Sequence, residues 1–179
     1  MTETVTLVGA GPGGAELLTR GGGAALRQAD AVVYDRLVDE SILDLIPKGA
    51  ERICVGKKMG HHPVPQDEIN ALLVRLARQG KRTVRLKGGD CYLFGRGGEE
   101  CEYLKAHGVP FRVLPGVTSA LAAPAFAGIP VTHRDFCSSV HIVTAHARAE
   151  KPLCIDFEAL VRTGGTLVFL TWPTPLRQG

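Results

Sequence analysis

Short apolar runs alternate with longer amphipathic stretches along most of the chain. Five of these runs are only three or four residues long, and they lie at 5–8, 31–34, 53–55, 83–86 and 111–114. Runs of this length, set between turn residues and charged residues, are typical of strands buried on both faces of a sheet. The pattern therefore predicts five strands.

The segments between the runs have helical patterns. Residues 66–78 place apolar side chains on one helix face, at Ile69, Leu72, Leu73 and Leu76. A second helix is expected over 99–107, before Gly108. In the first crossover, three glycines at 21–23 each cost about 1 kcal/mol against alanine, so we expect a short helix or one frayed at its start. Strand–helix alternation predicts an α/β fold, a parallel-rich sheet with flanking helices.

The pattern starts again after Pro130. Residues 140–144 and 166–170 are strand-like, and 156–162 are helical. We expect one α/β domain over 1–130 and the start of a second α/β domain over 131–179. Two strands and one helix do not close a sheet, so we expect this second domain to be incomplete.

Composition excludes several classes of protein. The net charge of +3 and the aromatic fraction of 6% give no sign of nucleic-acid binding. Five cysteines without a CxxC pair argue against a disulfide framework and against a metal site, and they suit reduced thiols in the cytoplasm. No apolar run is long enough to span a membrane, and the N-terminus lacks the pattern of a signal peptide.

The first motif with chemical content is Gly9-Ala10-Gly11-Pro12-Gly13-Gly14, directly after a strand. With Asp35 about 20 residues later, it matches the fingerprint of nucleotide-binding oxidoreductases. Pro12, however, removes an N–H group from a loop that would donate to pyrophosphate. A loop that approaches a ligand closely without contacting phosphate fits better, and the oxidoreductase stays an alternative.

Three further motifs follow strand ends, where open α/β sheets bind ligands. In the first, Gly88 and Gly89 would let a ligand lie on the backbone, and Asp90 would accept hydrogen bonds or simply cap a turn. In the second, Arg96 and Glu99 are three residues apart and can face the same way, as carboxylate binders or as part of a helix start. The third offers Thr118 or Ser119 as helix cap, ligand contact or both.

Charged residues also follow the second and third strands. Asp35-Arg36 and Gly56-Lys57-Lys58 are expected at one edge of the sheet, which favours a site there over isolated surface charges. Beyond Pro130, His133-Arg134 and His146 add basic groups.

The motifs together resemble those of the uroporphyrinogen-III C-methyltransferases, including the methyltransferase half of bifunctional sirohaem synthase. The resemblance covers about residues 4–170, in order and at the family's spacing, through VGAGPG, YDRLV, VGK, VPQDEIN, VRLKGGD, FGRGGEE, PGVTSA and AGIPVTHRD. It implies the N-terminal domain of a tetrapyrrole methylase over 1–130, with substrate and cofactor loops, and S-adenosylmethionine bound between two domains. It also implies a homodimer and two successive methylations of uroporphyrinogen III to precorrin-2, toward sirohaem, cobalamin or haem d1.

The resemblance also assigns roles, residue by residue. Asp35 matches the proposed proton acceptor and Lys57 the proposed proton donor, while Arg96 and Glu99 match positions that bind substrate and handle its proton. Substrate-side positions correspond to Arg134 and His146. Cofactor-contacting positions correspond to Pro12, Gly88, Gly89, Asp90, Leu93, Thr118, Ser119 and, by alignment to a methionine of the family, Thr171.

The chain departs from the family at a few positions. Gly14 stands where Asp is common, Cys91 where Pro is common, and Thr171 where Met is common. Two further alternatives stay open. One, of the same enzyme type, is a methylase acting on a different precorrin, and the other, which is non-enzymatic, is an inactive truncated remnant or fragment of such an enzyme.

Overall fold

The computed structural model describes residues 2–56, 64–144 and 155–170. By internal contacts the chain divides into two compact units, Met1–Ser119 and Ala120–Gly179, and each is described by itself. This division lies at the start of helix α5 (Ser119–Phe126), ahead of Pro130, where the sequence pattern changes. The functional boundary at residue 130 stays a prediction.

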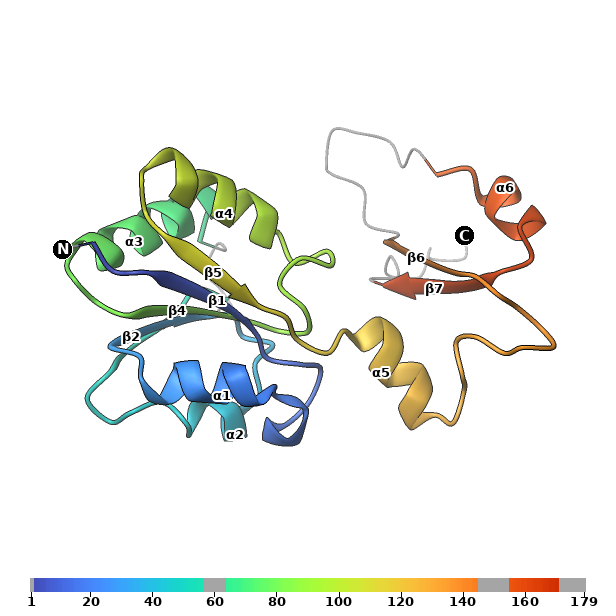
Figure 1. Ribbon diagram of the computed structural model, residues 1–179, viewed down its shortest axis with the longest axis horizontal. Helices are drawn as coiled ribbons and strands as arrows, with labels where there is room; N and C mark the ends of the chain where they lie inside the picture. The colour runs from blue at the N-terminus through green and yellow to red at the C-terminus, as the bar shows by residue number, and fades with distance from the viewer. Residues whose placement is uncertain (1, 57–63, 145–154, 171–179) are drawn as a thin grey trace, which may run out of the picture. The chain divides into compact units, whose positions relative to one another are not determined.

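The first unit is built on a five-stranded sheet in which every pairing is parallel (Figure 1). The spatial order is β3-β2-β4-β1-β5. The strands are β1 (Val5–Gly9), β2 (Ala31–Tyr34), β3 (Glu51–Cys54), β4 (Thr83–Lys87) and β5 (Phe111–Leu114). The α/β prediction is therefore confirmed, and β4 is the middle strand.

Helices cover both faces of this sheet (Figure 1). Alternate strand residues pack to opposite sides: Leu7 and Val33 join one apolar cluster, and Val8 and Val32 join the other. The first cluster contains α3 (Gln66–Arg78) and α4 (Gly97–Ala106), and the second contains α1 (Arg20–Arg27) and α2 (Glu40–Leu43). Burial on both faces explains the continuous apolar runs of the sequence.

In the first crossover, helix α1 has a capped start and packs closely on the sheet at a glycine. A 3₁₀ turn, η1 (Ala15–Leu17), leads into α1, which is short, with eight residues. Its start is capped rather than frayed, because the Thr19 hydroxyl oxygen accepts a hydrogen bond from the Gly22 N–H at 3.1 Å. A Cβ on Gly22 would lie 2.9 Å from Val8 Cγ1, so glycine lets the helix approach the sheet.

The second unit contains the elements that the sequence predicts. Strand β6 (Val140–Thr144) pairs in parallel with β7 (Thr166–Leu170), and α6 (Phe157–Arg162) precedes β7 in the chain. The Asp156 carboxylate caps α6 by accepting from the Ala159 N–H at 2.9 Å. In the part of the chain that the structure describes, no helix has the length and apolar character needed to cross a membrane.

Candidate functional site

Loops from three strands meet at the carboxyl-terminal edge of the first sheet. The helix after β1 and the helix after β4 lie on opposite faces, so the chain leaves these neighbouring strands toward opposite sides of the sheet. In open α/β sheets, such a switch point is where ligands bind. The candidate site is therefore the edge that carries the glycine motifs.

Four glycines form the centre of this edge, and we call Gly9, Gly11, Gly89 and Gly116 the glycine junction. Gly11 and Gly89 exchange two backbone hydrogen bonds, of 3.1 and 2.9 Å. A Cβ on Gly9 would lie 2.7 Å from the Gly89 carbonyl oxygen, and one on Gly116 would overlap the same oxygen. The backbones therefore pack directly on one another, as close approach without side chains requires.

Asp90 braces the junction. Its Oδ1 accepts hydrogen bonds from the N–H groups of Tyr92 and Leu93, at 2.8 and 3.0 Å, and its Oδ2 accepts from the Gly116 N–H at 3.0 Å. The turn-capping role expected from the sequence is thus present, and it extends to the loop after β5. A ligand-binding role for Asp90 stays a prediction, and so do the roles of Pro12, Gly88, Thr118 and Ser119 beside it.

Arg96 and Glu99 form a bidentate ion pair at the start of α4. Arg96 Nε donates to Glu99 Oε1 at 2.9 Å and Nη2 donates to Oε2 at 2.6 Å, so the two side chains face each other as the spacing predicts. The hydrogen bond with Glu99 raises the pKa of the Arg96 guanidinium. Arg96 adopts φ 59°, and Phe94, at φ 53°, is also left-handed. Strained backbone of this kind is often found at functional sites.

Asp35, at the end of β2, belongs to a cluster that sequence reasoning missed. We call Asp35, Arg85, Lys87 and Glu100 the buried charge cluster. Arg85 Nη2 donates to Asp35 Oδ1 at 2.7 Å, and Arg85 Nε donates to Glu100 Oε1 at 2.9 Å. Lys87 Nζ lies 3.0 Å from the same Glu100 oxygen. Asp35 is the member nearest to solvent, with 31% of its side chain exposed.

The carboxylates of the buried charge cluster shift the pKa of Arg85. Burial lowers the pKa of Arg85, but the carboxylates of Glu100 and Asp35 outweigh burial, and the pKa lies above the ordinary arginine value. The sequence did hold a sign of this cluster. Arg85 and Lys87 are charges at alternate positions of an otherwise buried strand, so they point to one face of the sheet, and such charges need partners there.

The remaining predicted site residues lie in different units of the chain or outside the described residues. Lys57, His146 and Thr171 lie outside the described residues. The loop that contains Gly56 does lie beside the loop after β2, as expected, because a Cβ built on Gly56 would lie 2.5 Å from the Arg36 backbone nitrogen. Arg134 is an exposed residue of the second unit. Within the first unit, the structure links Leu93 to the glycine junction through Asp90, pairs Arg96 with Glu99, and joins Asp35 through Arg85 to Glu100, the neighbour of Glu99 on α4.

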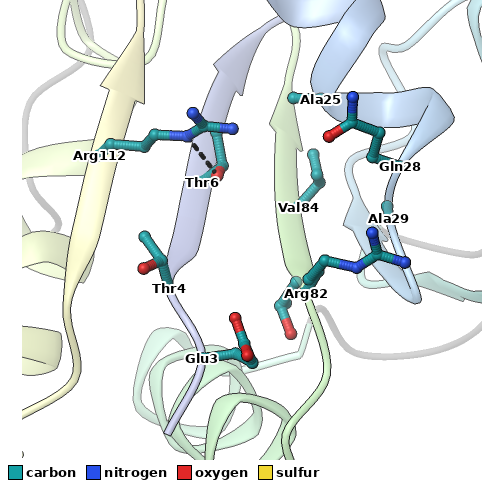
Figure 2. A pocket seen from close by; sticks show the side chains of 10 residues that line it. Glu3, Thr4, Thr6, Ala25, Gln28, Ala29, Arg82, Val84 and Arg112 are labelled. Carbon is teal, nitrogen blue, oxygen red and sulfur yellow. Dashed lines mark hydrogen bonds between the residues drawn. The ribbon is translucent and has the colours of Figure 1, made fainter.

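A hollow of about 230 Å³ lies at the opposite edge of the sheet (Figure 2). It is lined by residues at the strand starts, including Thr6, Arg82 and Arg112, and Arg112 Nε donates to the Thr6 hydroxyl at 2.9 Å. Arg82 is already paired with Asp30. Because α/β sheets bind ligands at the other end of their strands, this hollow is a poor candidate for the site.

Known proteins resemble this chain over nearly its whole length. Residues 4–177 match the family of Tetrapyrrole (Corrin/Porphyrin) Methylases. The chain is 56% identical to the porphyrin biosynthesis protein HemD of Ruminiclostridium josui, over 93% of this chain and 33% of that protein. It is 54% identical to siroheme synthase 2 of Yersinia pestis bv. Antiqua (strain Nepal516), over 92% of this chain and 35% of that protein.

Solved structures of methyltransferases also resemble this chain. A crystal structure of uroporphyrin-III C-methyltransferase from Thermus thermophilus, complexed with S-adenyl homocysteine, superposes with a TM-score of 0.75 at 44% identity, covering 93% of this chain and 65% of that one. A cobalt precorrin-4 methyltransferase gives a TM-score of 0.79 at 32% identity, covering 92% and 66%. The chain thus spans about a third of the length of the curated relatives named above.

Proposed function

The chain belongs to the tetrapyrrole (corrin/porphyrin) methylase family, and on this premise we propose that it serves the C-methylation of uroporphyrinogen III with S-adenosylmethionine as methyl donor. Two successive transfers would give precorrin-2, the precursor of sirohaem, cobalamin or haem d1. Because the chain covers only part of its curated relatives, we assign to it the sheet edge at which this reaction would take place rather than the activity of a whole relative.

The observation that carries the proposal is the open face of the glycine junction. Gly89 has φ +67°, and a Cβ built on it meets no atom of the described residues within 4 Å, so a ligand can lie directly on its backbone. A sulfonium donor carries no phosphate, which makes Pro12 acceptable in a loop that a dinucleotide would need as an N–H donor. The proposed donor contacts are Pro12, Gly88, Gly89, Asp90, Leu93, Thr118, Ser119 and Thr171.

The substrate side is proposed from charge. Uroporphyrinogen III carries eight carboxylates, and arginine binds carboxylates through two parallel hydrogen bonds. Arg96 already holds the Glu99 carboxylate in this way. A substrate carboxylate would therefore compete with Glu99 for the same guanidinium. Arg134 and His146 are proposed to bind further substrate carboxylates.

The residues of the chain would act on geometry and on protons. The donor supplies a methyl group, whose bond to sulfur breaks as a bond to the ring carbon forms, and the sulfonium becomes a neutral thioether. The site must hold the ring carbon in line at about 3–3.5 Å. The methylated carbon then loses a proton, for which Asp35 and Glu99 are the candidate bases, and Lys57 is the candidate proton donor.

Calorimetric titration tests the donor site. We expect S-adenosylhomocysteine to bind saturably and NAD not to bind. Gly89→Ala should weaken this binding at least about tenfold, because its methyl group occupies the open face. Gly108 is a matched control, since it also has φ +67° and no described atom within 4 Å of a built Cβ, but it follows the C-terminal end of α4, whereas Arg96 and Glu99 lie at the start of this helix. Gly108→Ala should leave the dissociation constant unchanged.

Other outcomes would favour the alternatives. Binding of NAD alone would contradict the methyltransferase proposal and favour a nucleotide-binding oxidoreductase. Binding of neither ligand would favour an inactive remnant or fragment. The likeness to cobalt precorrin-4 methyltransferase supports a methylase for another precorrin as second candidate, and transfer assays with uroporphyrinogen III against a later precorrin separate the two.

We further propose a cytoplasmic homodimer as the working state. Light scattering of the purified protein measures its mass in solution, and a mass of one chain at micromolar concentration would contradict the dimer.

A further inference from the structure

We propose that Glu100 is a positioning residue, which holds the Asp35 carboxylate at the sheet edge by acting through Arg85. The inference rests on the proposed function, in which Asp35 serves the reaction. Glu100 is fully buried in the first turn of α4, whereas Asp35 is partly exposed at the end of β2. The two carboxylates are joined by one guanidinium and have no direct hydrogen bond.

The geometry of Arg85 makes the connection rigid. Its Nε donates to Glu100 and its Nη2 to Asp35, while Nη1 donates to the carbonyl oxygen of Leu86 at 3.2 Å. The guanidinium is planar, so fixing one edge fixes the direction in which the other edge points. Only 2% of the Arg85 side chain is exposed, and water therefore does not compete for these bonds.

Glu100 is itself held by two further donors. Lys87 Nζ and Gln66 Nε2 both reach its Oε1, at 3.0 and 3.2 Å, so this oxygen accepts from three side chains. The other oxygen, Oε2, is buried and has no hydrogen-bond partner among the described residues. Donors from β4 and α3 thus fix the carboxylate on one side only.

Stability alone does not explain such an arrangement. Buried ion pairs are often no more stabilising than apolar side chains of similar volume, and a buried polar atom without a partner is a cost. The cluster does provide a fixed place for Asp35, the member that reaches the edge. Small displacements of a reacting group lower rates steeply, about 100-fold for 1 Å. We therefore assign the burial of Glu100 to the placement of Asp35.

Steady-state kinetics with uroporphyrinogen III test the role. Glu100→Gln keeps the shape and removes the charge, and we expect kcat to fall roughly tenfold while the dissociation constant of S-adenosylhomocysteine stays within about twofold. Glu100→Asp keeps the charge and should recover part of the loss. The control is Glu102→Gln, the same change at an exposed position of the same helix. Unchanged kcat in Glu100→Gln, or an equal loss in the control, would overturn the proposal.

A double-mutant cycle on stability tests the connection without turnover. In urea denaturation, Asp35→Asn with Glu100→Gln should be more destabilising than the two single changes combined, by at least about threefold in the unfolding equilibrium constant, because Arg85 then loses both carboxylates. Arg85→Lys, which cannot span both partners, should abolish this coupling. Additive effects would overturn the proposal, and Glu100→Met, which also removes the carboxylate, takes the place of Glu100→Gln should that variant not fold. Absence of turnover in the unaltered protein would count against the proposed function, while the cycle would still decide the coupling.

Discussion

Gly116 lies against the carbonyl oxygen of Gly89 so closely that the place of a Cβ atom on Gly116 is already taken by that oxygen. The loops after β4 and β5 therefore meet backbone to backbone, with the end of β1 beside them. The two glycines are 27 residues apart in the chain (116 − 89), so their contact is tertiary rather than local. Their contact is what gives the edge its shape.

Gly116→Ala should therefore destabilise the protein strongly. The new methyl group would overlap backbone on both sides, and backbone cannot move aside as a flexible side chain can. We expect a loss of about 3 kcal/mol or more, measured by urea denaturation. Gly98→Ala is the control, because Gly98 lies in α4 with open space around its Cβ position. That change should be neutral or stabilise by up to about 1 kcal/mol, and equal losses in both variants would contradict the prediction.

Asp90→Asn should loosen the same edge. The aspartate uses both oxygens as acceptors, and in asparagine one of them becomes an NH₂ group that cannot accept from a backbone N–H. At least one backbone donor, of which those of Leu93 and Gly116 are partly buried, then loses its acceptor, and we expect a loss of about 1 kcal/mol in unfolding free energy. Hydrogen exchange should show faster exchange at Gly116, Tyr92 or Leu93. Unchanged exchange at all three would show that Asp90 does not brace the loops.

The pair of Asp30 and Arg82 should make stability depend on acid pH. Hydrogen bonds from the Arg82 side chain and backbone lower the pKa of Asp30 from 3.8 to about 2. Because the pKa is lowered in the folded state, this stabilisation is complete above about pH 4 and is lost as the pH falls toward 2. The pair is exposed, so the effect is small. Asp30→Asn should lower the urea midpoint at pH 7, and the difference from the unaltered protein should vanish near pH 2. A difference that is constant with pH would contradict this.

Alkylation of the folded protein should modify Cys54 much faster than Cys91. Burial raises the pKa of the Cys91 thiol to about 12, whereas Cys54 is exposed. Since the thiolate is the nucleophile, Cys91 should react with iodoacetamide at pH 8 at least about 100-fold more slowly than Cys54. Peptide mass spectrometry after timed quenching measures both rates. Comparable rates in the folded protein would show that Cys91 is accessible, and equal rates are expected only in denaturant.

Edge strand β3 shows where sequence patterns are weakest. The apolar run predicted a strand at 53–55, but β3 spans Glu51–Cys54. Its first residues, Glu51 and Arg52, are exposed and carry no apolar pattern, because β3 pairs with one neighbour only, at the border of the sheet. The sequence pattern predicts that α4 starts at residue 99, but the helix starts at Gly97. The Gly97 N–H is held by the Cys91 carbonyl oxygen, a contact outside helix propensity.

The fold class, the strands buried on both faces and the sheet edge that carries the motifs can all be predicted from the amino-acid sequence, because burial and turn formation impose regular patterns on neighbouring residues. The three-residue spacing also allowed Arg96 and Glu99 to face each other, although Arg96 precedes the helix in a left-handed conformation that the spacing does not predict. The folded structure was needed to show that Arg85 joins Asp35 to Glu100 and that Gly116 packs on the carbonyl oxygen of Gly89. These contacts link residues far apart in the chain, and periodicity shows which face of an element is buried but not which side chain it meets there.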